Sequence, residues 1–447
     1  MAPLLRYAGL LREPDFRRLW LAQTVSQVGT QVTNLALPLV AILVLNASAF
    51  EVALLGAIEF LPFVFFTLPA GAWVDRLPKR RVLITADLGR AAILALVPIG
   101  YVTSVLAMWQ LYVIGFSAGI LTVFFEVAYQ SILPELVDRD RLAEGNSRLE
   151  ISRSAAQILG PGLGGFLVGV ITAPMAILAD ALSYLGSAGF LFGIRTAARA
   201  ATPPRGEGEA APAQEAATVA HPSLRHEIAE GLRFYAKSTL LLAESAAIVT
   251  MNLGSNISYS ILLVFLVREL GLKPEAIGIA FSIGSIGVLA GAVSAAAFGR
   301  RLGVGPALII ATAIVTGGAF LILLATPETA FVLLLAMAAV QGFSGIIINV
   351  NGVSLRQSLT PDHLQGRVNA TGRWINWSIL PLAAILGGII ATAIGLRGTI
   401  LVGAVIGLLS LPWLIFTPIR RLREMPQIRI GVPSPEIDVL PGGQPPA

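Results

Sequence analysis

The chain has 447 residues, of which 55% are hydrophobic and only 13% are charged, with a net charge of +5 and a mean hydropathy of +0.78. Soluble domains carry about 25% charged residues, so this composition excludes a soluble globular domain and a soluble helical solenoid. The absence of Cys excludes disulfides and thiolate metal sites, and because the three His residues fall in expected loops and linkers we expect neither a metal site nor a bound cofactor.

Apolar runs of about twenty residues recur along almost the whole chain, and about 20 residues cross a bilayer as a helix. We therefore predict an all-α membrane protein with twelve transmembrane helices in two pseudo-symmetric bundles of six. The expected spans are residues 18–45, 51–73, 82–103, 108–133, 149–171, 174–195, 240–267, 275–298, 306–326, 329–357, 368–394 and 397–417.

The basic residues are distributed unevenly over the two sides of the membrane that these spans define. If the N-terminus is cytoplasmic, 27 of the 31 Lys and Arg residues fall in cytoplasmic segments and only three in outer loops. This positive-inside pattern predicts that both termini are cytoplasmic, and it relates the positive charge to the lipid bilayer rather than to nucleic acid. Arg outnumbers Lys 28 to 3, which is typical of a GC-rich bacterial genome, so we expect a bacterial cytoplasmic (inner) membrane.

Polar residues gather on one side of the first span. Its Gln and Asn residues recur at helical spacing, and Val and Leu residues take the opposite side. The stripe consists of Gln23, Gln27, Gln31 and Asn34. Hydrogen bonding between helices would explain a single such residue, but a whole stripe favours a helix that borders a water-filled, substrate-binding cavity.

A charged loop, GAWVDRLPKRR at residues 71–81, joins the second and third spans. It places one acid and four bases between two apolar segments. The positive-inside rule explains such a cluster as a topology anchor on the cytoplasmic side.

Ionisable side chains inside membrane spans are costly and are usually functional. The spans contain Glu59, Asp87, Arg90, Glu126, Asp180 and Glu244. Structural ion pairing is the alternative, for Asp87 with Arg90 at a spacing of three or for Glu126 with Arg153 on the fifth span. Glu244 begins the seventh span, where we expect it at the membrane interface.

The acids are confined almost entirely to the first half of the chain. Between Ser245 and Thr417 no acid falls inside a span. Desolvation favours the protonated form of a carboxyl group, so a carboxyl group within the membrane is suited to carry a proton. Any proton coupling should therefore reside in the N-terminal half, with Glu126 as the first candidate, Glu59 as the second and Asp180 as the third.

The fifth span contains GPGLGG at residues 160–165. Pro161 removes a backbone donor and kinks the helix, and Gly160, Gly164 and Gly165 permit close approach of a neighbouring helix. The segment can be a packing device alone or a hinge between two states.

The segment at residues 196–239 divides the chain into two halves. Its first part is rich in Ala, Pro, Glu and Gly, as linkers are, and residues 223–238 place apolar residues at helical spacing, as in a short amphipathic helix on the membrane surface. We therefore predict an N-terminal bundle (1–195), a cytoplasmic linker (196–239), a C-terminal bundle (240–417) and a flexible cytoplasmic tail (418–447).

The two halves resemble each other. Asn252 and Asn256 continue the polar stripe on the seventh span, the repeat mate of the first. The tripeptide GFS occurs at 115–117 and again at 342–344, an offset of 227 residues. A parallel repeat of six spans is typical of transporters, with the substrate site between the halves near the middle of the membrane.

Several motifs resemble those of the major facilitator superfamily over nearly the full length of the chain. GxxxDRxxKR at 71–80 resembles its motif A, with Pro78 in place of the usual Gly, and GPxLGG at 160–165 resembles motif C of proton-coupled exporters, with Ser152 at another usual Gly. FRRLW (16–20), DRLPKRRVLITADLGR (75–90) and the segment from Glu126 to Asn146 are similar to the drug:H⁺ antiporter-3 branch, which includes macrolide and enterobactin exporters. The resemblance implies the major facilitator fold.

The resemblance also implies a conformational latch in the charged loop. In motif A, the Asp and Arg pin this loop to the cytoplasmic end of helix 11 in the outward-facing state. The corresponding latch residues are Gly71, Asp75, Arg76, Lys79 and Arg80.

We expect a secondary active transporter that exports small amphipathic molecules, such as drugs or macrolides, by alternating access and proton antiport. It would work as a monomer, with the proton gradient as its energy source. The expected cavity residues are the two polar stripes together with Phe125, Tyr129, Asn349, Trp374 and Trp377.

Two other functions remain open. A dedicated siderophore or lysophospholipid exporter is one; an anionic siderophore would require Arg90, Arg153 and Arg373 to face the cavity rather than to pair with acids. A non-transporting membrane sensor or scaffold is the other, and it predicts that neutralising Glu126 or Glu59 leaves the phenotype intact. We expect no enzyme, because the sequence has no Ser/His/Asp set, metal cluster or phosphate-binding Gly loop.

Overall fold

A computed structural model describes residues 9–195, 233–361 and 364–426, and this described part contains helices and no strand. The N-terminal half consists of α2 (Pro14–Leu43), α3 (Ala49–Val74), α4 (Lys79–Val102), α5 (Met108–Leu136), α6 (Leu142–Ile171) and α7 (Ala173–Phe192). The C-terminal half consists of α9 (Thr239–Arg268), α10 (Pro274–Gly284), α11 (Ile286–Leu302), α12 (Val304–Leu323), α13 (Ala330–Leu359), α14 (Gln365–Leu408) and α15 (Ser410–Ile415). Short 3₁₀ turns are η1 (Gly9–Arg12), η2 (Arg139–Arg141) and η4 (Pro418–Arg421).

The helices begin where local sequence signals place them. Ser48 and Glu51 form a capping box at the start of α3, in which the Ser48 hydroxyl accepts from the Glu51 amide and the Glu51 carboxylate accepts from the Ser48 amide. Such reciprocal bonds satisfy amides that the first helical turn leaves free. α2 and α10 begin with proline, whose missing amide proton costs nothing at that position.

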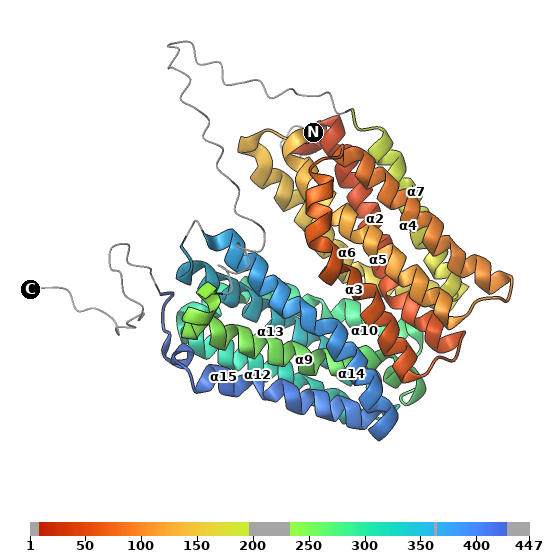
Figure 1. Cartoon of the computed structure of the whole chain (residues 1–447). Helices are drawn as coiled ribbons and strands as arrows, with labels where there is room; N and C mark the ends of the chain where they lie inside the picture. The colour runs from red at the N-terminus through yellow and green to blue at the C-terminus, as the bar shows by residue number, and fades with distance from the viewer. Residues whose placement is uncertain (1–8, 196–232, 362–363, 427–447) are drawn as a thin grey trace, which may run out of the picture.

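The helix count agrees with the sequence prediction. The described residues contain 11 helical segments long and apolar enough to span a membrane, and the last of them, Thr371–Ile415, has 45 residues. Inside it, Gly395 has φ 79° and ψ 173°, a conformation outside the helical region that glycine adopts without strain. The chain reverses there, so α14 runs out and back (Figure 1), and the described part contains the twelve predicted crossings.

The two halves share a backbone plan. α2 and α9 both have 30 residues and start 225 residues apart, and the turn at Gly395 matches one at Thr172, whose φ is 82°. Equivalent contacts relate α5 to α13: Gly119 packs on the Glu59 carbonyl, and Gly342 packs on the Gly284 carbonyl. The structural offset in this pair is therefore 223, and the sequence match at 227 is wrong by one helical turn.

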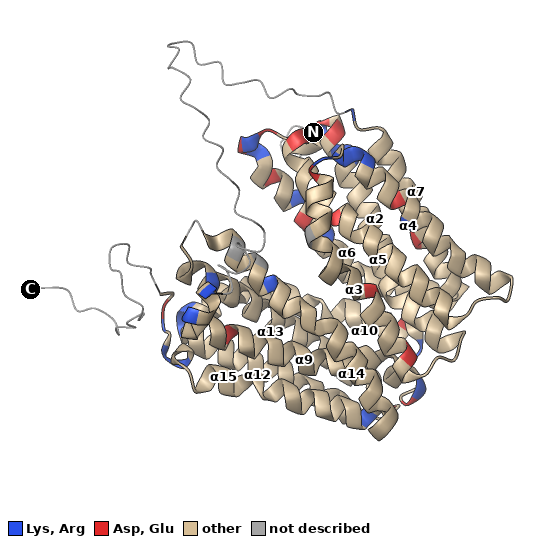
Figure 2. Ribbon diagram, in the orientation of Figure 1, with Lys and Arg blue, Asp and Glu red and all other residues tan. Residues whose placement is uncertain are grey.

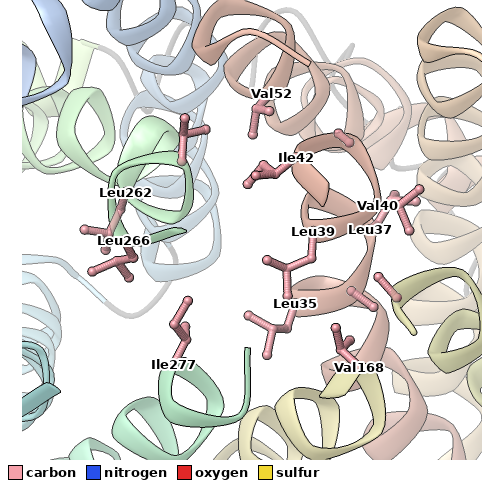
Figure 3. Packing of buried hydrophobic residues seen from close by; sticks show 14 of the residues in the cluster. Leu35, Leu37, Leu39, Val40, Ile42, Val52, Val168, Leu262, Leu266 and Ile277 are labelled. Carbon is pink, nitrogen blue, oxygen red and sulfur yellow. The ribbon is translucent and has the colours of Figure 1, made fainter. Parts of the chain in front are cut away.

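One hydrophobic cluster joins the two halves at one end of the molecule. It combines residues of α2 and α3 with residues of α9 and α10 (Figure 3). We call this end, with the loops at 44–48, 103–107 and 269–273, the closed end. Arg268 ties the halves together there by donating to the Ala47 carbonyl at 2.7 Å.

The halves diverge toward the other end, where each has a core of its own (Figure 1). One cluster lies entirely within the N-terminal half, around Phe16, Leu83 and Ile132, and another lies within the C-terminal half, around Leu241 and Leu355. We call this the basic end, because Lys and Arg gather at its loops (Figure 2). The molecule is therefore closed at one end and parted at the end rich in positive charge.

The segments outside the bundles fit the predicted boundaries in part. Most of the linker and of its expected amphipathic helix lies outside the described residues, although Tyr235 is described and is buried. The predicted flexible tail requires a correction at its start. Ile419 and Leu422 are buried, and the Leu422 carbonyl accepts from the Gly305 amide at 2.9 Å, so residues 418–422 pack against α12. The end of the tail lies outside the described residues.

Candidate functional site

The charged loop after α3 forms two kinds of contact. Lys79 lies 3.5 Å from Glu135 at the end of α5, and Arg80 donates to the carbonyls of Leu191 and Phe192 at the end of α7. Cations at a helix C-terminus satisfy carbonyls that have no helical partner. These two residues therefore hold helix ends together within the N-terminal half.

The other predicted latch residues have no such partners. Asp75 and Arg76 are exposed at the C-terminal end of α3, and neither side chain forms an ion pair or hydrogen bond among the described residues; Gly71 lies one turn before them. The halves are parted at this end, which is the arrangement in which a latch between them would be released. The latch stays a prediction for these three residues.

The glycines of the fifth span lie at a helix crossing between the halves. A Cβ atom added at Gly165 would lie 3.0 Å from the Gly278 Cα atom of α10, and the Gly162 amide donates to Ser282 Oγ at 2.7 Å. Gly160 and Gly164 instead face α2, where an added Cβ would meet Gln31 and the Val32 backbone. α6 stays helical through Pro161. The close packing is confirmed, and the hinge stays a prediction.

An ion pair is buried inside the N-terminal bundle. Arg90 pairs with Asp87 on α4, as the spacing of three predicts, and the Ser187 hydroxyl donates to the same carboxylate at 2.6 Å. The guanidinium lies between two rings, 4.3 Å from the centre of Phe125 and 4.1 Å from that of Tyr184. Cation–π contacts of this kind are strongest where water is excluded.

Asp180 on α7 belongs to the same buried site but has no cation of its own. It is fully buried, and its carboxylate accepts from Thr33 on α2 at 2.5 Å and from Ser183 at 3.0 Å. Gly29 makes room for it, because a Cβ atom there would collide with the Asp180 and Ser183 side chains. Thr33 connects Asp180 directly to the helix that carries the polar stripe.

The charges of this site do not balance. Two carboxyl groups share one guanidinium, and the Nε of Arg90 lacks a hydrogen-bond partner among the described residues. If both acids were ionised, the site would hold one excess negative charge away from water, and such a charge costs several kcal/mol. One proton on Asp180 removes that excess while both hydroxyl contacts remain possible.

Glu126 and Glu59, which the sequence analysis placed ahead of Asp180 as proton carriers, have different surroundings. Glu126 is half-buried on α5, one residue from Phe125. Glu59 is half-buried on α3 with its Cγ against Gly115 of α5. Neither forms an ion pair among the described residues, so the alternative pairing of Glu126 with Arg153 is absent there.

The polar stripe of α2 divides between interior and surface positions. Gln23 is buried, and its Oε1 has no partner in the described part of the chain. Gln27 is half-buried, Gln31 packs on Gly160 of α6, and Asn34 is exposed next to Thr33. The stripe thus passes from the N-terminal bundle to its surface.

The matching stripe of α9 borders a cavity of about 320 Å³ inside the C-terminal half. Asn252 donates to the Asn376 carbonyl at 3.5 Å, and Asn256 donates to the Asn252 carbonyl at 3.0 Å. Both residues line the cavity, together with parts of α12, α13 and the returning arm of α14.

The remaining predicted contact residues lie in three places. Phe125 is buried against Arg90 and stacks on Tyr129, so it lies inside the bundle rather than at its surface. Asn349 and Trp374 are exposed. Trp377 of α14 meets the rings of Phe60 and Phe63 of α3 edge-on, with centroids 6.0 and 6.5 Å away, and so joins the two halves.

Sequence reasoning missed the partners of the buried acids. Glu244 is buried near the start of α9 and pairs with Arg356 of α13 at 2.7 Å, and its position at the membrane interface stays a prediction. Thr33, Ser183 and Ser187 hold the buried acids, and only the helical spacing between Asp180 and Ser183 could have suggested one of them. Among the described residues, no group of three or more His, Asp or Glu side chains could hold a metal ion.

Comparison with known proteins places the chain among membrane transporters. A family model described as "transmembrane secretion effector" matches residues 7–440. The multidrug efflux pump Tap of Mycolicibacterium fortuitum is 29% identical over 420 residues, which cover 90% of this chain and 95% of that protein. Macrolide efflux protein A of Streptococcus pyogenes is 25% identical over 167 residues, 37% of this chain and 41% of that protein.

Solved structures confirm the fold. A bacterial homologue of the iron transporter ferroportin, in an inward-facing state, superposes with a TM-score of 0.68 at 18% identity, covering 91% of this chain and 99% of the other. A bacterial homologue of the human lysosomal transporter Spinster, inward-facing and unoccupied, superposes with a TM-score of 0.67 at 14% identity, covering 92% and 98%. At these identities the likeness concerns the fold.

Proposed function

The chain belongs to the transmembrane secretion effector family of the major facilitator superfamily, and we propose that it exports small amphipathic molecules in exchange for protons. It is a multi-pass membrane transporter of the efflux type and not an enzyme. The observation that carries the proton-coupled part is the buried site of Asp87, Arg90 and Asp180, with two acids and one base.

The way the halves are joined supports transport by alternating access. The shared hydrophobic cluster holds them at the closed end, and the separate cores at the basic end let them part. The positive-inside rule favours the cytoplasm for the basic end, which supports a state open to the cytoplasm. Both faces of the transport path come from one chain, which supports a monomeric unit.

Asp180 is the proton carrier in this proposal, ahead of Glu126 and Glu59. It is fully buried, no cation of the described residues contacts it directly, and its hydrogen bond from Thr33 connects it to α2. When the carboxyl group gains a proton, the site becomes neutral and Thr33 is no longer held by a charge-assisted bond, which is roughly twice as strong as a neutral one. Proton binding would thereby alter how α2 packs against α7.

The surfaces between the halves support an amphipathic cargo. Trp374 and Trp377 of α14 are 53% and 42% exposed, and the amide side chain of Asn34 is exposed on α2. Aromatic rings with amide groups nearby bind molecules that combine apolar surface with a few polar atoms.

An anionic cargo is the second candidate, on one specific observation. Arg153 of α6 and Arg373 of α14 are both exposed, and neither pairs with an acid among the described residues. Arg90 does not support this candidate, because Asp87 neutralises it. An anionic catecholate siderophore should therefore be included as a competitor in the transport assay.

The test is efflux of the cationic dye ethidium from energised cells, with and without a protonophore. Wild type is compared with Asp180→Asn, Glu126→Gln and Glu59→Gln at matched amounts of protein in the membrane. We expect protonophore-sensitive efflux in the wild type and its loss in Asp180→Asn. Efflux that survives Asp180→Asn but is lost in Glu126→Gln or Glu59→Gln would move the proton site to that residue. Efflux by all variants despite the protonophore would contradict proton antiport.

A further inference from the structure

The cavity inside the C-terminal half lies where the N-terminal half has its buried ion site. It is enclosed by α9, α12, α13 and the returning arm of α14, and the ion site is enclosed by the equivalent helices α2, α4, α5 and α7. The same compartment of the fold is therefore filled in one half and hollow in the other.

Contacts at equivalent positions differ between the halves. Gly29 of α2 packs on Asp180, whereas Gly254, 225 residues later, packs on the backbone of Gly403 and Gly407. The turns at Thr172 and Gly395 relate α7 to the returning arm of α14 by 223 residues, so Gly403 stands in the place of Asp180. By the same offset, Gly407 stands in the place of Tyr184. The C-terminal half thus has neither the carboxylate nor the ring, and its glycines let α9 and the returning arm of α14 approach closely beside the cavity.

Most of the cavity lining is apolar, and its polar groups are uncharged. Met and Leu side chains border it together with the amide groups of Asn252, Asn256 and Gln341 and the hydroxyls of Thr316 and Tyr259, and no Asp, Glu, Lys or Arg is among the described residues that line it. The Gln341 and Tyr259 side chains form no hydrogen bond with other described residues, and Tyr259 is 63% exposed at the cavity border. Unpaired polar groups in a cavity call for water or a ligand.

We propose that this cavity is a subsite that binds an uncharged, hydrogen-bonding part of the exported molecule. The proposal rests on the export function proposed above and names the part of the cargo that the C-terminal half recognises. Ligand pockets commonly measure about 300–1,000 Å³, so a cavity of about 320 Å³ takes one ring system of a drug-sized molecule rather than the whole. A charged group would be desolvated there without a counter-ion.

The test fills the cavity from one side and compares a neutral with a cationic cargo. Ala319→Phe places a ring in the cavity from α12, and Ala313→Phe adds the same ring on the same helix outside the cavity lining. KM for efflux is measured with Nile red, which is neutral and accepts hydrogen bonds, and with ethidium, which is a cation. We expect Ala319→Phe to raise the KM for Nile red at least fivefold more than the KM for ethidium, and Ala313→Phe to change both alike.

A second variant removes polarity without filling space. Gln341→Leu deletes one amide, and the loss of one hydrogen bond to the ligand predicts a roughly tenfold weaker affinity for Nile red. Equal effects of Ala319→Phe on both dyes, or an unchanged KM for Nile red in both variants, would overturn the subsite.

A failure of the proposed export function can be distinguished from a failure of the subsite. If wild type moves neither dye, export of amphipathic cargo is refuted, and the subsite is then tested by Nile red binding to the purified protein in nanodiscs. Binding to wild type that Ala319→Phe abolishes and Ala313→Phe retains would support the subsite. Binding that is absent from wild type, or equal in both variants, would refute it.

Discussion

The two halves of this transporter have the same arrangement of helices, but the inside of one is charged and filled and that of the other is uncharged and has a cavity. The N-terminal half fills the space between α2, α4 and α7 with Asp87, Arg90, Asp180 and Tyr184. The C-terminal half has a cavity in the equivalent compartment, where Gly403 and Gly407 pack closely on α9 and α12 and where α12 carries no ionisable residue. The two halves therefore share one arrangement of helices, and a few side chains give one half a buried ion pair with a second acid and the other an uncharged cavity.

The largest effect is expected from breaking the ion pair of the N-terminal half. Arg90→Met leaves Asp87 buried without its cation, which destabilises a protein by roughly 3–5 kcal/mol. Thermal unfolding of the purified protein in detergent measures this loss. In the C-terminal half, Thr316→Val removes a buried hydroxyl bonded only to backbone carbonyls, and we expect a loss of about 1 kcal/mol.

The double variant Asp87→Leu with Arg90→Met is the control for that prediction. Removing both charges of a buried pair is often neutral, so the double variant should regain most of the stability lost by Arg90→Met. A double variant no more stable than Arg90→Met would show that the guanidinium acts through its ring contacts rather than through Asp87.

A medium effect is expected from the two equivalent glycines. At Gly254 a Cβ atom would meet the backbone of Gly403 and Gly407, which cannot yield without moving a helix, so Gly254→Ala should cost about 1–3 kcal/mol. At Gly29 it would meet Ser183 Oγ and Asp180 Oδ1, which can turn aside, and Ser183 Cβ at 2.8 Å, which needs only a small shift, so Gly29→Ala should cost less.

Thermal unfolding compares these two variants with Gly317→Ala in α12, where an added Cβ atom meets nothing within 4 Å. That control should gain up to about 1 kcal/mol of helix propensity. If Gly29→Ala loses as much stability as Gly254→Ala, the packing around the two glycines is more alike than their contacts indicate.

At the charged loop, the smallest effect on stability is expected for Asp75 and a larger one for Arg80. Arg80→Ala removes bonds to the Leu191 and Phe192 carbonyls and should cost about 1–3 kcal/mol, since hydrogen bonds to charged groups are worth that much. Asp75→Asn should leave thermal unfolding unchanged, because Asp75 is exposed and has no partner in the described part of the chain. If Asp75 belongs to the latch, ethidium efflux should nevertheless fall in Asp75→Asn; unchanged efflux would remove Asp75 from the latch.

The sequence predicts the transmembrane helices and their order well, and it predicts the contacts inside each half poorly. The twelve spans follow from apolar length, and the break expected between 394 and 397 falls at Gly395, where glycine permits the turn. The pairing of Asp87 with Arg90 follows from helical spacing within α4. These features depend on neighbours along the chain.

Contacts between distant helices could not be predicted in the same way. The bond from Thr33 to Asp180 joins residues 147 positions apart, and the burial of Glu244 depends on Arg356, 112 positions away. The sequence match at an offset of 227 misaligned α5 and α13 by one turn, because short identical motifs do not fix the register of a helix. The cavity in the C-terminal half is bordered by residues of four helices that lie far apart in the sequence, and no motif records it.

The central claim, that one buried carboxyl group of the N-terminal half exchanges its proton for cargo, can be tested by measuring proton release. Ethidium is added to the purified protein in nanodiscs in weakly buffered solution near neutral pH, and a pH-sensitive dye records the protons released as cargo binds. Our account predicts release by wild type, Glu126→Gln and Glu59→Gln, and none by Asp180→Asn, provided that each variant binds ethidium. Undiminished proton release by Asp180→Asn would contradict it.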